Sequence, residues 1–365
     1  MVGRTRPNSS PYRPKRELRI AAAAVAFVML LVLGGLVLSS HRDRRSADEM
    51  PPVHRTATAV PTAALPTTTT VRAAFYYPWF PETHAWATKY TPTLGQYDSG
   101  NPTILNAHVA LARQAGLDAF ISSWWGRGTP TDRRLTFLLD AARAQDFHVA
   151  AYYEPASIVP APTAAQLSAD FSALATRADQ EPAWLRVSGR PVLFVYNLGS
   201  EASCAATHRL KTANAGRFYL NLKVFKGYDS CPDQPDSWHQ YAPARPYDQQ
   251  GRYSATVSPG FCKFNESRPR LTRDLARFEA DLARQVGSGA HWQLITSFNE
   301  WGEGTAVEPA NEWSSSSGLG SYLTAIKAAY GTATPAGTTT PPLAESAGGS
   351  ASPANPGQER GVPGC

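Results

Sequence analysis

The sequence predicts an α/β protein with a single (β/α)₈ TIM-type barrel, preceded by an N-terminal transmembrane helix. Three observations support this fold. Short apolar, β-rich segments alternate with helix-period segments over roughly 260 residues, which is the size and order of elements of such a barrel. No glycine-rich phosphate-binding turn follows the first expected strand, which argues against a doubly wound sheet. An uncharged segment of 19 residues lies near the N-terminus and is long enough to cross a bilayer.

The chain begins with a basic segment, residues 1–19, ahead of the apolar segment 20–38. Six Arg or Lys and one Glu give the first segment a net charge of +5. The positive-inside rule therefore places it in the cytoplasm and the rest of the chain outside. We expect an uncleaved, single-pass signal anchor in the cell membrane, because a cleaved signal peptide usually has an apolar region of about 7–15 residues. Cleavage is the alternative, although "LVLSSHRD" is a poor cleavage site.

The charge of the remaining chain excludes one class of partner. The formal net charge is +6 for all 365 residues, so only about +1 remains after residue 19. A domain without a basic face has no electrostatic reason to bind nucleic acid. Residues 39–70 are rich in Pro and Thr and predict an extended linker, and the low-complexity residues 331–365 predict a disordered tail. A single, monomeric barrel domain is expected over residues 71–330.

Eight segments with apolar, β-branched and aromatic residues carry the barrel prediction. In chain order, the expected strands are residues 72–79, 118–125, 148–155, 191–197, 217–224, 237–243, 254–261 and 292–301. Three segments between them have the period of a helix: residues 104–118, 131–145 and 270–287. The last of these repeats apolar residues at spacings of 4, 3, 4 and 4, beginning at Leu271.

Aromatic and acidic residues gather where these strands end, and barrel active sites form at the C-terminal ends of the strands. The residues at those ends are Tyr76, Tyr77, Trp79, Trp124, Trp125, Tyr152, Tyr153, Glu154, Tyr196, Asn197, Asn299, Glu300, Trp301 and Glu303. Aromatic rings stack on the C–H faces of sugars, and carboxyl groups bind sugar hydroxyls or protonate a glycosidic oxygen. The strand ends therefore predict a glycan-binding cleft.

The segment "ITSFNEWGEGTAVEP", residues 295–309, holds the two acids that are best placed for catalysis. In a continued strand, Glu300 and Glu303 would lie about 10 Å apart and on opposite faces. Gly302 and Gly304 can adopt positive φ and so permit a turn. We expect the strand to end near Trp301 and both carboxylates to face the barrel mouth. A separation of about 5–5.5 Å would indicate retention, and about 6.5–9.5 Å inversion.

"SFNEWGEGTAVEP" resembles the signature NEW-x-EGT-x-x-EP of glycoside hydrolase family 99, the group of endo-α-1,2-mannosidases and endo-α-1,2-mannanases. "FYYPWF", "SSWWGRG", "AYYEP" and "SPGF" agree with further motifs of the family in the same order. The resemblance implies a (β/α)₈ barrel that needs no metal or other cofactor. It also implies endo-acting cleavage of α-mannosidic linkages in an oligo- or polysaccharide, with retention.

The resemblance also implies roles for individual residues. Glu300 matches the base that deprotonates the substrate's own 2-hydroxyl, giving a 1,2-anhydro sugar, and Glu303 matches the acid that protonates the leaving group and then activates water. The implied substrate-binding residues are Tyr76, Trp79, Trp124, Glu154, Tyr196, Asn299 and Trp301. Many members have His where this chain has Gly302, so related surface-polysaccharide linkages are included among the expected substrates.

Several alternatives stay open at this point. Only one residue of each adjacent pair, Tyr76 or Tyr77 and Trp124 or Trp125, can face the mouth; the resemblance favours Tyr76. A non-catalytic glycan-binding barrel would use the same aromatic residues. A retaining β-glycosidase would carry Asn-Glu on its fourth strand, whereas here the pair follows the last. Glu308 is expected to support the loop by hydrogen bonding.

The four cysteines predict a disulfide rather than a metal site. They are Cys204, Cys231, Cys262 and Cys365, without a C-x-x-C motif. Outside the cytoplasm thiols pair, so we expect two of the first three to form a disulfide and Cys365 to be unpaired.

Overall fold

A computed structural model describes residues 69–82, 86–155, 161–198 and 201–331. The expected cytoplasmic tail, transmembrane helix, nearly all of the linker and the C-terminal tail lie outside these residues, as does Cys365. Within the described ranges, no helix combines the length and apolar character needed to cross a bilayer.

Strands and helices alternate over most of the domain. The strands are β1 (Val71–Tyr76), β2 (Ala119–Trp124), β3 (His148–Tyr153), β4 (Arg186–Val187), β5 (Arg190–Val195), β6 (Tyr219–Lys223), β7 (Ser237–His239), β8 (Tyr247–Gln250), β9 (Ser254–Val257) and β10 (Trp292–Ile295). The α-helices are α1 (Pro102–Gln114), α2 (Pro130–Ala144), α3 (Ala164–Gln180), α4 (Cys204–Asn214), α5 (Leu275–Val286) and α6 (Gly320–Gly331). Two short 3₁₀ turns, η2 (Tyr228–Ser230) and η3 (Asn311–Trp313), complete the described elements.

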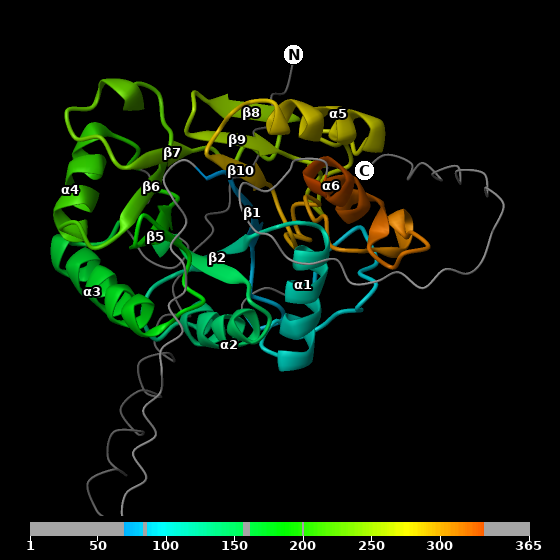
Figure 1. The fold of residues 1–365 in the computed structure, drawn as a ribbon, viewed down its shortest axis with the longest axis horizontal. Coiled ribbons are helices and arrows are strands. Elements are labelled where there is room, and N and C mark those ends of the chain that lie inside the picture. The colour runs from blue at the N-terminus through cyan, green and yellow to red at the C-terminus, as the bar shows by residue number, and fades with distance from the viewer. Residues whose placement is uncertain (1–68, 83–85, 156–160, 199–200, 332–365) are drawn as a thin grey trace, which may run out of the picture. The chain divides into compact units, whose positions relative to one another are not determined.

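The sheet is a nearly closed barrel of parallel strands with helices around its outside (Figure 1). Eight parallel strands follow one another in the order β7-β6-β5-β3-β2-β1-β10-β9, and β4 and β8 add antiparallel edges to β5 and β9. Each of the eight falls within, or within one residue of, one of the segments predicted as strands. Side chains help to bridge the seam between β7 and β9, because the Thr256 hydroxyl donates to the carbonyl of Gln240 (2.7 Å).

Two predicted boundaries are wrong. The last strand ends at Ile295 rather than near Trp301, because the chain then pairs with itself: the N–H of Ser297 donates to the carbonyl of Thr305 (2.9 Å). The helix predicted from 270 begins at Leu275, where Asp274 caps it by accepting from the N–H of Arg277 (2.9 Å).

The domain has two apolar layers, one inside the barrel and one between the strands and the helices. The alternation of side chains along each strand determines which layer a residue belongs to. One layer occupies the barrel interior and includes Phe75, Tyr152, Phe194 and Trp292. The other lies between the strands and the helices and includes Phe120. Neighbouring residues of one strand therefore belong to different layers, which fixes the side chains that can reach the mouth.

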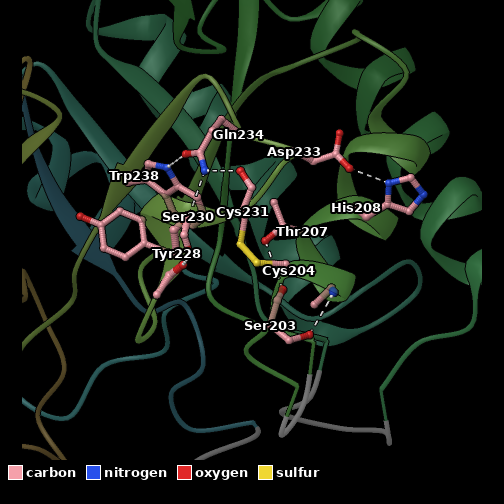
Figure 2. Close-up of a disulfide and its surroundings, with 12 residues drawn as sticks. Ser203, Cys204, Thr207, His208, Tyr228, Ser230, Cys231, Asp233, Gln234 and Trp238 are labelled. Atoms are coloured by element: carbon pink, nitrogen blue, oxygen red, sulfur yellow. Dashed lines mark hydrogen bonds and ion pairs between the residues drawn. A yellow bond between two sulfur atoms is a disulfide. The ribbon is translucent and has the colours of Figure 1, made fainter.

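The expected disulfide joins Cys204 and Cys231, whose Cα atoms are 5.2 Å apart. Figure 2 shows it linking the start of α4 to the segment after η2. In the same segment, the Gln234 side chain binds the Trp238 indole (2.8 Å) and the Cys231 carbonyl (2.9 Å). The connection thus fixes the long β6–β7 segment, which has no α-helix among the described residues.

Replacing Cys204 and Cys231 together by Ser is expected to destabilise the domain by about 3 kcal/mol. The disulfide closes a loop with a sequence separation of 27, and a crosslink of this span removes about that much chain entropy from the unfolded state. Urea unfolding of the variant and the wild type would measure the change. An unchanged unfolding midpoint would contradict the expectation.

Candidate active site

The mouth of the barrel is lined by residues that continue the alternation of the interior layer. From β1, Phe75 is followed two residues later by Tyr77, and from β3, Tyr152 is followed by Glu154. Tyr77 and Glu154 interact electrostatically with each other and with Glu303. Side chains from separate strands and from the loop after β10 therefore converge at one place.

Tyr76 and Trp124 lie on the other side of the strands, which corrects their expected place in the cleft. Tyr76 is fully buried under α1, and its hydroxyl bonds to His108 (2.9 Å). Trp124 is fully buried against the helices, and its indole N–H donates to Asp132 (2.8 Å). Both belong to the outer layer by strand parity, so Tyr77 and Trp125 occupy the corresponding interior positions.

Two other predicted binding residues do lie at the mouth. Trp79 is partly exposed and stacks on Tyr77, with ring centroids 4.5 Å apart. The ring centroids of Trp79 and Trp125 are 5.8 Å apart. Tyr196 is partly buried, and its hydroxyl interacts with Glu154 and Glu303. Together they provide aromatic surface close to the acids.

The loop after β10 curls so that Glu300 and Glu303 interact directly. The N–H of Glu303 donates to Oε1 of Glu300 (3.2 Å). The turn depends on Gly304, which has φ +66° and whose added Cβ would lie 2.6 Å from the carbonyl oxygen of Cys262. Gly302 does not have positive φ; an added Cβ there would lie 3.1 Å from Oε1 of Glu300.

Burial dominates the electrostatics of the two acids. It raises the pKa of Glu300 well above the usual value, and repulsion from Glu303 adds to the rise. Burial also raises the pKa of Glu303, while Lys263 (3.7 Å) and the Tyr241 hydroxyl (3.2 Å) favour its charged form. Two neighbouring carboxyls with raised pKa values retain a proton between them more readily than isolated acids.

Glu154 is a third acid at the same mouth. Burial raises the pKa of Glu154 to about 7, and the charge of Glu303 adds to this rise. A hydrogen bond from Ser123 opposes the rise. A carboxyl that titrates near neutral pH can bind a sugar hydroxyl as donor or as acceptor.

Glu154→Gln is expected to stabilise the protein above pH 7 and not at pH 4.5. The folded pKa, about 7, lies above the reference value of 4.5, so the wild type loses stability as the pH rises through this window and the variant does not. At about 1.4 kcal/mol per pKa unit, and allowing for partial exposure, the gain is about 2 kcal/mol. Melting temperatures from pH 4.5 to 8.5 would measure it, with the exposed Glu279→Gln as control; a pH-independent difference would contradict the shift.

Asn299 and Trp301 position the loop and do not line the cleft, which corrects their predicted role as binding residues. The Asn299 carboxamide is fully buried and pairs with both the N–H (2.8 Å) and the carbonyl (3.1 Å) of Tyr77. The buried Trp301 indole donates to Glu308 (3.1 Å). Glu308 is itself fully buried and bonded to Tyr97 (2.7 Å), as expected for a residue that supports the loop.

Three further residues at the mouth were not predicted from the sequence. Tyr241 and Lys263 contact Glu303 directly, and Lys223 lies over the ring of Tyr196 with Nζ 4.3 Å from its centroid. Lys223 could have been found from alternation, because it follows Tyr219 and Asn221 on the same face of β6. The described residues contain no group of three or more His, Cys, Asp or Glu placed to hold a metal ion.

Part of the chain is similar to a known protein family. The family model "Glycosyl hydrolase family 99" matches residues 72–216, so the loop with Glu300 and Glu303 lies beyond the matched residues. No curated protein matches the chain.

Solved structures extend the similarity over the whole barrel. A GH99 endo-alpha-mannosidase from Bacteroides thetaiotaomicron, in complex with bis-tris-propane, is similar with a TM-score of 0.59 and 20% identity over 72% of this chain and 96% of that one. A structure described as a glycoside hydrolase-like protein has a TM-score of 0.58 and 17% identity over 72% and 94% of the two chains. At these identities the likeness establishes the barrel fold.

Proposed function

We propose that the chain is a glycoside hydrolase family 99-like glycosidase that cleaves internal α-mannosidic or related surface-polysaccharide linkages with retention. The observation that carries the proposal is the pairing of Glu300 and Glu303 in one curled loop at the barrel mouth. Aromatic rings that follow β1 and β5, Trp79 and Tyr196, lie at the same mouth and suit the C–H faces of sugar rings.

The proposed reaction has two steps. Glu300 takes the proton of the substrate's 2-hydroxyl, O2 bonds to C1, and the glycosidic bond breaks as Glu303 protonates the leaving oxygen. Glu303 then takes a proton from water, the water oxygen bonds to C1, and the C1–O2 bond breaks as Glu300 returns its proton to O2. Two inversions at C1 give net retention. A hydroxyl held against C1 reacts at high effective molarity, and acid assistance adds about 10²–10⁴-fold.

The pKa shifts of the two acids run opposite to what the first step needs. Burial raises the pKa of Glu300 more strongly than that of Glu303, whereas the first step needs the proton on Glu303. Tyr241 and Lys263 favour the charged form of Glu303 and so oppose the effect of burial. We expect a bound glycan to place its leaving oxygen beside Glu303 and its 2-hydroxyl beside Glu300, which moves the proton to Glu303.

The proposed location is the outer side of the cell membrane, with the N-terminal residues as a single-pass anchor. The disulfide between Cys204 and Cys231 supports an oxidising compartment. The charge asymmetry of the N-terminal segment supports the orientation.

Digestion of polysaccharides tests the function. Purified full-length protein would be incubated with linear and branched α-mannans and with bacterial surface polysaccharides, and the products sized and sequenced. Internal cleavage appears as oligosaccharides of several lengths, with the α-anomer formed first. Binding without any shortening of the polymers would favour the non-catalytic glycan-binding barrel instead.

A further inference from the structure

Lys223 is a cation at the barrel mouth that the proposed reaction does not use. It ends β6 on the face that also carries Tyr219 and Asn221, which is the interior face of the barrel. The next interior position on the neighbouring strand β5 is Tyr196, and Nζ of Lys223 lies 4.3 Å from the centroid of that ring. The ammonium group therefore lies beside an aromatic surface of the cleft.

The charge of Lys223 has no carboxylate partner in the described part of the chain. Among the described residues, none forms an ion pair with Lys223, and Glu201, which lines the same cavity, is bound to Arg209. The residue opposite Lys223 on β7 is His239, whose pKa is lowered well below the usual value by burial and by the charge of Lys223, so it is uncharged. Burial also lowers the pKa of Lys223.

A partly buried ammonium without a counter-ion costs free energy that an anionic ligand can recover. The contact with Tyr196 offsets part of this cost through a cation–π interaction. The cavity that Lys223 lines also includes Asn197 and Phe225. The amide of Asn197 is thus a hydrogen-bonding group in the same cavity as the ammonium.

We propose that Lys223 and Tyr196 form a subsite for a negatively charged sugar residue of the glycan, one that carries a carboxylate or a phosphate. The inference rests on the proposed function, because the subsite belongs to the same cleft. Lys263 is already paired with Glu303, so it does not provide an equivalent free cation.

Calorimetry with the full-length protein tests the subsite without relying on hydrolysis. The probes are methyl α-mannoside, D-mannuronate and mannose 6-phosphate, each titrated into the wild type, Lys223→Met and Lys226→Met. Lys226 is exposed on the loop three residues after Lys223. Lys226→Met therefore removes the same charge outside the cavity and serves as the matched control. The wild type and Lys226→Met are expected to bind at least one anionic sugar about tenfold more tightly than the neutral one, as charge-assisted hydrogen bonds predict. Lys223→Met is expected to lose this preference.

The outcomes separate the two proposals. A preference for mannuronate assigns a carboxylate as the natural anion, and a preference for mannose 6-phosphate assigns a phosphate. Equal binding of charged and neutral sugars by the wild type, or a preference that survives in Lys223→Met, overturns the subsite. If the preference depends on Lys223 but no polysaccharide is cleaved, the subsite stands and the proposed hydrolysis fails.

Discussion

Glu300→Gln is expected to lower kcat on the natural glycan by about 10³-fold or more. The substitution keeps the shape and the hydrogen bond from the N–H of Glu303 but removes the group that takes the 2-hydroxyl proton. General base catalysis contributes about 10²–10⁴-fold, and loss of the attacking oxyanion also removes the advantage of its position. Hydrolysis followed by reducing-end release, together with glycan binding by calorimetry, would measure the effect.

Two controls make this result specific. Glu279→Gln changes an exposed acid on α5 and is expected to leave kcat unchanged. Glycan binding by Glu300→Gln is expected to persist. The stability of this variant at pH 8 is expected to exceed that of the wild type, because burial raises the pKa of Glu300 in the folded state and the variant has no carboxylate charge to bury. Activity within tenfold of the wild type would remove Glu300 from the reaction.

Glu303→Gln is expected to lose activity in a way that depends on the leaving group. The natural leaving oxygen needs a proton, so kcat falls by about 10²–10⁴-fold on the glycan. A glycosyl fluoride of the same sugar needs no such proton, so the first step on that substrate stays close to the wild-type rate. Burst kinetics on the fluoride would separate this step from the later attack of water, which Glu303 also assists.

Glu300→Gln and Glu303→Gln are expected to differ in their activity on the glycosyl fluoride. Glu300→Gln is expected to be slow on both the glycan and the fluoride, because the base acts in the first step whatever the leaving group is. Equal losses on the two substrates for Glu303→Gln would argue that Glu303 holds the loop and does not protonate the glycosidic oxygen.

The sequence was sufficient to place the eight barrel strands, because each is a short apolar segment between clear turn or helix signals. It was not sufficient to choose between adjacent aromatic residues at the strand ends. That choice depends on strand parity, which is set by distant contacts such as the pairing of Tyr76 with His108. Family resemblance pointed to Tyr76, whereas the interior layer takes Tyr77.

The loop after β10 shows a second limit of sequence reasoning. The segment from Thr296 to Phe298 continues the strand by residue type, yet Ser297 and Phe298 pair with Thr305 and Val307 of the same loop. Asn299 appeared to be a ligand-binding residue by type, but its carboxamide serves as a partner for the backbone of Tyr77. Such pairings between distant segments leave no local pattern in the sequence.

A crystal structure of Glu300→Gln with an α-linked oligosaccharide would test the central claim most directly. The account predicts a sugar ring at the barrel mouth, with its 2-hydroxyl within about 2.6–3.2 Å of the Gln side chain at position 300 and its glycosidic oxygen within the same reach of Glu303. An oligosaccharide bound with both side chains out of reach of one glycosidic linkage would contradict it.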